Sequence, residues 1–381
     1  MKTLRGTSWR GKDCDDGNKS IHPGSRPQFS DKTKDSNCNG IFGTDTAGNS
    51  YEDKMCLNSQ QRGSVVLGDS VSAHFHIPRE WFNTSEISVE KFEPLLFMLE
   101  NEFDWPELSA TTGYMNNPYP NINHGPTDSI YLRLRDRNRC NHRDYQNIAV
   151  NGAKSGSMDD IMLSLYRNVS TDYPMILYYA LIGNDVCNGH HMTTPEEMMN
   201  NTMTTLKYLE KVLPNGSHVF LTALIDGRVL YNSLHNRTHP IGSLRNDVTY
   251  SALYDYLNCL QISPCTGWMN SNETVRNLTT ERANQLNVVL QHLASNYTFP
   301  NYKLYYIVNP VNEVLDEFEK AGGHKWELIE PVDGLHTNQL GQALTAKIIW
   351  ENLEKNFPEV IGPVNPNNDK IQQIFGDQGG Y

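Results

Sequence analysis

Several features that would mark other classes of protein are missing from this sequence. It has no run of 18 or more apolar residues, so no membrane-spanning helix is expected. Acidic residues outnumber basic ones, and the net charge of −12 argues against a general nucleic-acid binder, which usually carries a basic surface. No Cys-x-x-Cys pair occurs, which argues against a zinc ribbon or a thioredoxin-like site. The Gly-x-Ser-x-Gly elbow of α/β-hydrolase lipases is absent too.

The chain has 381 residues, of which 38% are hydrophobic and 20% charged, a composition typical of a globular protein. It is long enough to form one large core. Residues 1–60 show almost no apolar periodicity and are rich in Asp, Asn, Gly and Ser, which predicts irregular backbone held by an external constraint. Residues 61–361 form the main predicted domain. Residues 362–381 are rich in Pro, Asn and Gly and are expected to pack as an extended tail or to stay mobile.

Strand and helix patterns alternate through the main domain, which predicts an α/β fold with a mainly parallel sheet covered on both faces. The expected strands are 65–67, 146–150, 175–182, 218–223 and 304–308. The expected helices are 92–102, 158–167, 195–212, 248–257, 281–294, 311–320 and 340–353.

Ser70 is the strongest candidate for a nucleophile. The apolar run Val65, Val66 and Leu67 is short and β-branched, and Gly68 ends it, so it is typical of a buried strand. A serine just after such a strand lies at the carboxyl edge of the sheet, where open α/β folds bind their ligands. A helical turn after it would aim backbone N–H groups at the atom that the serine attacks.

Two further stretches supply partners for this serine. Asp333 and His336 are spaced so that one short turn can deliver a general base and the carboxylate that orients it. Asn184 follows the strand predicted at 175–182, and its side chain, with a glycine N–H, can donate to an oxyanion. The three stretches together predict a serine nucleophile with its base and oxyanion donors.

Gly68-Asp69-Ser70, the glycine of Asn151-Gly152, Gly183-Asn184-Asp185 and Asp333-x-x-His336 resemble the four ordered blocks of the GDSL/SGNH hydrolases. The resemblance implies a three-layer α/β/α, flavodoxin-like fold. It also implies a triad of Ser70, His336 and Asp333, and an oxyanion hole made by the Ser70 N–H, the Gly152 N–H and the Asn184 side chain.

Longer stretches are similar to the branch of this family that removes the secondary acyl chains from bacterial lipopolysaccharide. They cover residues 4–11, 68–77, 140–147, 183–187, 330–336 and 375–380. This similarity implies a secreted esterase that cleaves acyloxyacyl bonds of lipid A without an organic cofactor. A broader GDSL esterase, phospholipase or deacetylase shares every catalytic block, and a calcium-stabilised lipid-binding module without turnover is a third interpretation.

Seven cysteines and nine Asn-x-Ser/Thr sequons favour an oxidising, secretory route. We therefore expect a secreted or endolysosomal glycoprotein. Because no signal peptide precedes Leu4, we also expect that Met1 is not the native start or that a leader and further segments are left out. An odd cysteine number suggests one intermolecular bridge or one free thiol. The resemblance points to Cys259 as the link to a saposin-like small subunit and to a local Cys14–Cys38 bridge, whereas buried or inert thiols are the alternative.

The acidic N-terminal segment contains the first half of an EF-hand-like loop, Asp-x-Asn-x-Asn-Gly-Ile. Oxygen ligands at alternate positions of a flexible loop favour Ca²⁺ in a structural role. Position 46 is Thr where an EF-hand carries Glu, so Glu52 is the expected substitute, and a loop closed by a disulfide without metal is the alternative. The candidate ligands are Asp13, Asp15, Asp16, Asp35, Asn37, Asn39, Ile41 and Glu52.

The residues that recognise substrate are harder to predict. His74 and His76 flank the nucleophile and either line the substrate mouth or are structural, and His235 is another possible lining residue. Arginines alternate from 133 to 139, which on a strand would place Arg135 and Arg137 on one face, suited to lipid A phosphates. A charged alternating stretch is equally typical of a solvated sheet edge.

Overall fold

The computed structural model describes residues 6–188 and 191–381, so Leu4 and Arg5 of the first matching stretch lie outside the described residues. Five parallel strands form one sheet in the order β2-β1-β3-β4-β5. This confirms the predicted parallel, flavodoxin-like sheet. The strands are β1 (Gly63–Gly68), β2 (Tyr145–Asn147), β3 (Met175–Ala180), β4 (Ser217–Thr222) and β5 (Tyr302–Ile307).

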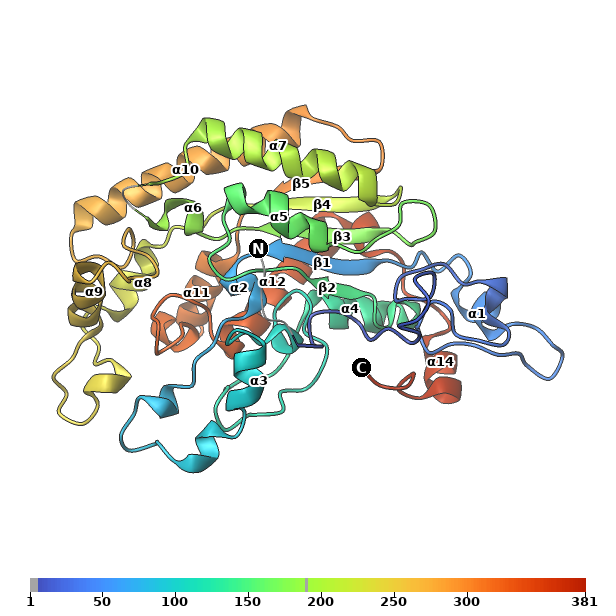
Figure 1. The fold of residues 1–381 in the computed structure, drawn as a ribbon, viewed down its shortest axis with the longest axis horizontal. Helices are drawn as coiled ribbons and strands as arrows, with labels where there is room; N and C mark the ends of the chain where they lie inside the picture. The colour runs from blue at the N-terminus through green and yellow to red at the C-terminus, as the bar shows by residue number, and fades with distance from the viewer. Residues whose placement is uncertain (1–5, 189–190) are drawn as a thin grey trace.

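Helices cover both faces of the sheet (Figure 1). On one face, Leu67, Tyr179 and Leu221 pack against α7 and α10; on the other, Val66, Tyr178 and Phe220 pack against α4, α12 and α13. Alternate residues of each strand therefore enter different cores, as expected for a sheet buried on both sides. The helices are α1 (Tyr51–Cys56), α2 (Ser70–Ala73), α3 (Leu95–Glu100), α4 (Ile130–Arg137), α5 (Met158–Ile161), α6 (Asn184–Cys187), α7 (Pro195–Val212), α8 (Arg228–Leu234), α9 (Tyr250–Cys259), α10 (Glu273–Asn296), α11 (Val311–Lys320), α12 (Gln339–Asn356), α13 (Pro358–Ile361) and α14 (Asn368–Phe375).

The described N-terminal segment and the C-terminal residues both contact the chain at or next to β2, through Gly11 to Tyr145 and through Gly380 to His142. Residues 6–60 are irregular apart from α1 and one short 3-10 turn, as predicted. The expectation of an extended C-terminal tail is wrong for Asn368–Phe375, which form α14. Beyond α14, the side chain of Gln378 donates to the Asn39 carbonyl, so the tail holds the N-terminal segment.

Three disulfides cross-link the described chain. Cys14–Cys38 is the predicted local bridge, and Cys56–Cys140 and Cys187–Cys265 join sequence positions that are 84 and 78 residues apart. Cys259 is free and exposed at the end of α9. Three structural disulfides indicate an oxidising, secretory compartment. No helix in the described ranges has the length and apolar content needed to cross a membrane.

Candidate active site

Ser70 opens α2 directly after β1, where the sequence placed it. Asp69 is the N-cap of this turn, and its buried carboxylate accepts from the N–H of Val71 (3.1 Å) and of Ile182 (2.8 Å). The carboxylate therefore ties the nucleophile turn to the end of β3. Burial raises the pKa of Asp69 to about 6, although these two hydrogen bonds oppose the shift. Asp69 thus fixes the turn, and these two hydrogen bonds go to backbone N–H groups and not to His336.

His336 Nε2 lies 2.7 Å from Ser70 Oγ, and His336 Nδ1 lies 2.8 Å from Asp333 Oδ2. These are hydrogen-bond distances, so the three side chains form a continuous relay. The other oxygen of Asp333 accepts from the N–H of Leu335 (2.7 Å) and of His336 (3.0 Å). The turn that carries His336 therefore also fixes the carboxylate that orients the His336 ring.

The electrostatics of this relay suit a general base. Burial alone would lower the pKa of His336, but the charge of Asp333 and its hydrogen bond outweigh burial and raise it. Burial would likewise raise the pKa of Asp333, yet the imidazole and two backbone N–H groups hold it below its usual value. The carboxylate stays ionised and stabilises the imidazolium that forms when His336 takes the serine proton.

Gly334 gives the turn its shape. Its φ of +65° is in the left-handed region, and an added Cβ would lie 2.2 Å from the Tyr254 hydroxyl. The turn is closed by two backbone bonds, from the Glu330 N–H to the His336 carbonyl (2.8 Å) and from the Gly334 N–H to the Glu330 carbonyl (2.9 Å). Any side chain at 334 would displace the triad turn.

The predicted oxyanion donors come from the ends of neighbouring strands. Gly152 is exposed beyond β2 with a φ of +74°, and Asn184 begins α6 beyond β3. The side-chain nitrogen of Asn184 donates to the Ala153 carbonyl at 3.0 Å and lies 3.5 Å from Asp69 Oδ2, and these two contacts fix the orientation of the side chain. Because β2 and β3 flank β1, the sheet order brings both residues to the edge that carries Ser70.

His76 and Glu330 form a buried pair that the sequence did not predict as a unit. Glu330 places both carboxylate oxygens 2.8 and 2.9 Å from His76 Nδ1, and His76 Nε2 lies 3.0 Å from the Ile122 carbonyl. Both ring nitrogens face oxygen atoms, an arrangement that suits an imidazolium paired with the Glu330 carboxylate. Burial opposes this state, but the Glu330 charge raises the pKa of His76. The pair joins the segment after Ser70 to the loop that carries Asp333; the Glu-x-x-Asp-x-x-His spacing was the available signal.

The other predicted histidines have structural positions. His74 is fully buried, neither ring nitrogen has a partner among the described residues, and burial lowers its pKa to about 3. His235 is half-buried and stacks on Tyr231, and its Nδ1 donates to the Tyr231 carbonyl. Of these three predicted histidines, His76 lines the cavity that is described below.

The strand expected for the alternating arginines is wrong, because residues Ile130–Arg137 form α4. On a helix, residues two apart point in different directions, so no single arginine face exists. Arg135 donates to His142 Nδ1 (3.0 Å) and Arg137 to the Gly362 carbonyl (2.6 Å). These contacts hold the chain around α4 and leave no shared phosphate site.

The N-terminal segment brings part of the predicted calcium set together. Glu52 is buried and its carboxylate meets the side chains of Asn37 (3.1 Å) and Asn39 (3.0 Å). Asp35 accepts from the Gly40 N–H at 2.8 Å, and its Oδ1 is buried without a partner among the described residues. Burial raises the pKa of Asp35 to about 6 and of Glu52 to about 7.

The other three predicted aspartates have different surroundings, and Asp13 lies beside this loop at Cys38. Asp15 pairs with Lys34, and Asp16 is exposed. Asp13 lies near Cys14 and Cys38, but those two sulfurs form a disulfide and offer no thiolate ligand. The orphaned Asp35 oxygen and the buried Glu52 carboxylate, whose hydrogen-bond partners are neutral amides, fit a hard cation bound by Asp35, Asn37, Asn39 and Glu52.

Comparison with known proteins identifies a matching family and similar sequences. The sequence profile described as GDSL-like Lipase/Acylhydrolase matches residues 65–349. The chain is 50% identical to the acyloxyacyl hydrolase of Oryctolagus cuniculus and 50% identical to that of Homo sapiens, in each case over 386 aligned positions. The alignments cover 100% of this chain and 66% of each relative, so the chain spans about two thirds of their length.

A solved acetyl xylan esterase from Geobacillus stearothermophilus aligns with 77% of this chain and 96% of its own, at 8% identity. Its TM-score is 0.37, which is too low to support a shared function.

Proposed function

Because the chain belongs to the GDSL-like lipase/acylhydrolase family, we propose that it is a serine esterase that removes secondary fatty-acyl chains from the lipid A of lipopolysaccharide. The observation that carries the proposal is the relay of 2.7 and 2.8 Å from Ser70 through His336 to Asp333. The choice of substrate rests on the 50% identity to acyloxyacyl hydrolases along the whole chain.

In the first half-reaction, Ser70 Oγ attacks the ester carbonyl carbon and its proton passes to His336 Nε2. The carbonyl oxygen becomes an oxyanion that the Ser70 N–H, the Gly152 N–H and the Asn184 amide stabilise. When the intermediate collapses, the bond to the leaving oxygen breaks and His336 returns the proton to that oxygen. The products are a free hydroxyl on the lipid and an acyl group on Ser70.

Water completes the cycle. His336 removes a proton from a water molecule as the water oxygen attacks the acyl carbon, and the second oxyanion uses the same donors. Collapse breaks the bond to Ser70 Oγ, which regains its proton from His336, and a fatty acid leaves. Asp333 remains ionised throughout and keeps the imidazole in the productive tautomer.

Mass spectrometry of lipopolysaccharide incubated with the wild type, Ser70→Ala and Ser72→Ala tests the proposal. Ser72 lies on the same turn, and its hydroxyl donates to the Ala180 carbonyl at 3.5 Å and not to the triad, so it is a matched control. We expect loss of secondary acyl chains with the wild type and Ser72→Ala and none with Ser70→Ala. Cleavage of short p-nitrophenyl esters without any lipopolysaccharide cleavage would favour the broader esterase. A wild type that neither cleaves esters nor reacts with a fluorophosphonate would favour the lipid-binding module.

We also propose that Ca²⁺ stabilises the N-terminal segment through Asp35, Asn37, Asn39, the Ile41 carbonyl and Glu52. The support is the buried, unpartnered Asp35 oxygen and the meeting of Glu52 with both asparagines. A cation here would offset the burial of two carboxylates where little apolar core exists. Chelation should lower the melting temperature of the wild type and have a smaller effect on Glu52→Gln. An unchanged wild-type melting temperature would refute this.

We further propose that the protein enters the secretory route and that Cys259 joins it to a saposin-like small subunit. The assignment is supported by the exposed, unpaired thiol of Cys259, since the other six cysteines form three disulfides. Electrophoresis of the full-length protein should show one mass shift on reduction that Cys259→Ser abolishes. A shift that persists in Cys259→Ser would exclude this residue as the link.

A further inference from the structure

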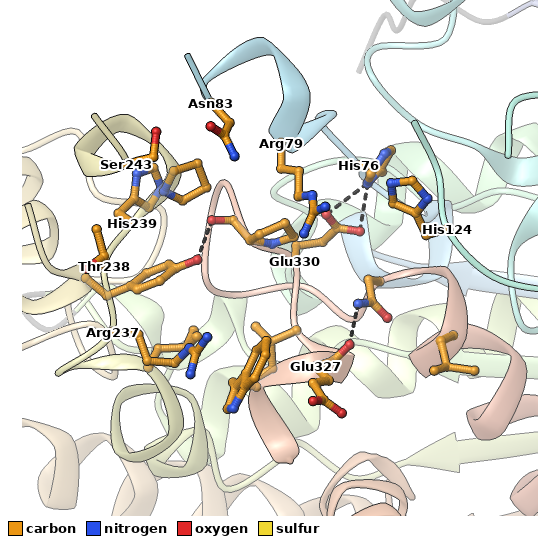
Figure 2. A pocket seen from close by; sticks show the side chains of 18 of the residues that line it. His76, Arg79, Asn83, His124, Arg237, Thr238, His239, Ser243, Glu327 and Glu330 are labelled. Carbon is orange, nitrogen blue, oxygen red and sulfur yellow. Dashed lines mark hydrogen bonds and ion pairs between the residues drawn. The ribbon is translucent and has the colours of Figure 1, made fainter. Parts of the chain in front are cut away.

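A cavity of about 570 Å³ lies beside the catalytic loop, and its lining contains none of the triad residues. Its size falls within the range of small-molecule sites. Figure 2 shows Arg79, Asn83 and His124 on one side and a second group, Arg237 to Ser243, on the other, with Glu330 between them. Glu330 and Pro331 reach the cavity, and Asp333 follows two residues later, so the cavity adjoins the reacting centre.

Buried polar groups in this cavity lack partners. Asn123 is fully buried, and neither its side-chain oxygen nor its nitrogen has a hydrogen-bond partner among the described residues. The hydroxyl oxygen of Ser243 is also buried and has no hydrogen-bond partner among the described residues. Buried polar atoms are nearly always hydrogen-bonded, so orphans that share one cavity point to a ligand with both donors and acceptors.

The charge in the cavity is also incompletely balanced. Arg79 faces Glu86 at 3.3 Å, and His76 is paired with Glu330. Arg237 instead lies over the Trp326 ring, 3.4 Å from its centroid, and no carboxylate of the described ranges comes within ion-pair distance of it. A guanidinium held flat on an aromatic ring keeps its N–H edge free for two-point contact with an anion such as a phosphate.

The far wall of the cavity is hydrogen-bonded to the backbone that precedes Asp333. The hydroxyl of Tyr250 donates to the Pro331 carbonyl, and His239 Nε2 donates to the Val332 carbonyl at 2.8 Å. A ligand in the cavity is thus connected to the triad turn through two hydrogen bonds.

We propose that this cavity binds the phosphorylated sugar headgroup of the lipid whose ester is cleaved at Ser70, with Arg237 contacting the phosphate and Asn123 and Ser243 contacting sugar hydroxyls. The inference rests on the proposed function, because it assumes that one substrate carries both the headgroup and the ester. Arg237 is then a specificity residue that binds the substrate without taking part in the bond changes.

Steady-state kinetics of Arg237→Gln test this assignment, with Arg245→Gln as the control. Arg245 is an exposed arginine on the same loop and does not line the cavity. Arg237→Gln should raise KM for phosphorylated lipid A by about 10- to 100-fold, the loss expected for one bidentate contact to a charged group. The kinetics on p-nitrophenyl butyrate should stay unchanged, and Arg245→Gln should match the wild type on both substrates. An unchanged lipid KM, or an equal change on the neutral ester, would overturn the proposal.

A binding measurement keeps this test separate from the proposed reaction. Glucosamine 1-phosphate, glucosamine and inorganic phosphate are each titrated calorimetrically into Ser70→Ala and into Ser70→Ala with Arg237→Gln. Preferential binding of the sugar phosphate, weakened at least 10-fold by Arg237→Gln, would support the site even if lipopolysaccharide is not hydrolysed. Equal binding of inorganic phosphate would mean an anion site unrelated to a headgroup, and no binding of any probe would mean no site; either result overturns the proposal.

Discussion

The buried pair of His76 and Glu330 makes a prediction about the pH dependence of stability. Glu330→Gln keeps the size and shape of the side chain but removes the charge that holds His76 as an imidazolium. In the variant, the glutamine oxygen could still accept from His76, but no charge would balance a buried imidazolium. Burial then favours the neutral His76 ring, which donates to the Ile122 carbonyl and accepts from the glutamine N–H. Its surroundings then resemble those of His74, where burial without an acid lowers the pKa to about 3.

The sign of the effect follows from proton linkage. In the wild type the raised pKa of His76 stabilises the fold below the unfolded value of about 6.5, and this stabilisation is lost as pH rises through the folded value. In Glu330→Gln the folded pKa is depressed, so the unfolded chain binds one extra proton as pH falls below about 6.5. Relative to the wild type, the variant should lose about 2 kcal/mol of unfolding free energy between pH 7 and pH 5.

Urea denaturation at pH 7, 6 and 5 measures this difference directly. The control is Glu351→Gln, which removes an exposed carboxylate 3.8 Å from Lys347 on α12 and should change stability by less than about 0.5 kcal/mol at every pH. His76→Gln combined with Glu330→Gln should abolish the extra pH dependence, because the titrating ring is gone. A stability difference between Glu330→Gln and the wild type that is the same at all three pH values would refute a charged His76.

Other predictions concern the chemistry and its donors. Asp333→Asn should lower kcat by about 10⁴, because His336 loses its orienting carboxylate. Since Asp333 raises the pKa of His336, the acid limb of the pH profile of kcat/KM should also move to lower pH in this variant. An acid limb at the same pH as in the wild type would contradict the assignment of His336 as the base. Asn184→Ala should lower kcat by about 10²–10³ with little change in KM, as expected for a lost oxyanion donor, whereas a pure KM effect would exclude that role. Gly334→Ala should lose most activity and stability, because of the positive φ and the close Tyr254 hydroxyl, and a fully active variant would show that the turn can relax.

The strands and the triad could be predicted from the sequence because their signals are local. Strands buried on both faces are short apolar runs, as in Val65 to Leu67, and Asp333 and His336 lie within one turn. Helices α7 and α11 occur at the predicted residues, 195–212 and 311–320. In each, periodic apolar residues and clear ends coincide.

The errors arise where polar residues hide the pattern. In α4 the alternating arginines imitate a strand, but Ile130, Tyr131 and Leu134 form a buried helical face, and Ser129 caps the first turn by accepting from the Leu132 N–H. In α10 the first two turns, before the predicted start at residue 281, bury polar side chains instead of apolar ones. One of them, Thr280, accepts from the indole of Trp268 at 3.0 Å. Such a helix start depends on tertiary partners that periodicity does not show.

The pair of His76 and Glu330 also depends on tertiary contacts that the sequence does not show. The active site combines both kinds of placement, by the sheet and by tertiary contacts. Ser70 and the oxyanion donors follow β1, β2 and β3, which are adjacent in the sheet, so the parallel order alone brings them together. His336 arrives from 266 residues away on a loop that no strand places directly. Besides the triad's own hydrogen bonds, this loop is held by the bonds from Tyr250 to the Pro331 carbonyl and from His239 to the Val332 carbonyl. The contact of Glu330 with His76 adds a tie to the segment that follows Ser70, and we expect it to help the serine and its base keep their separation while the proton moves between them.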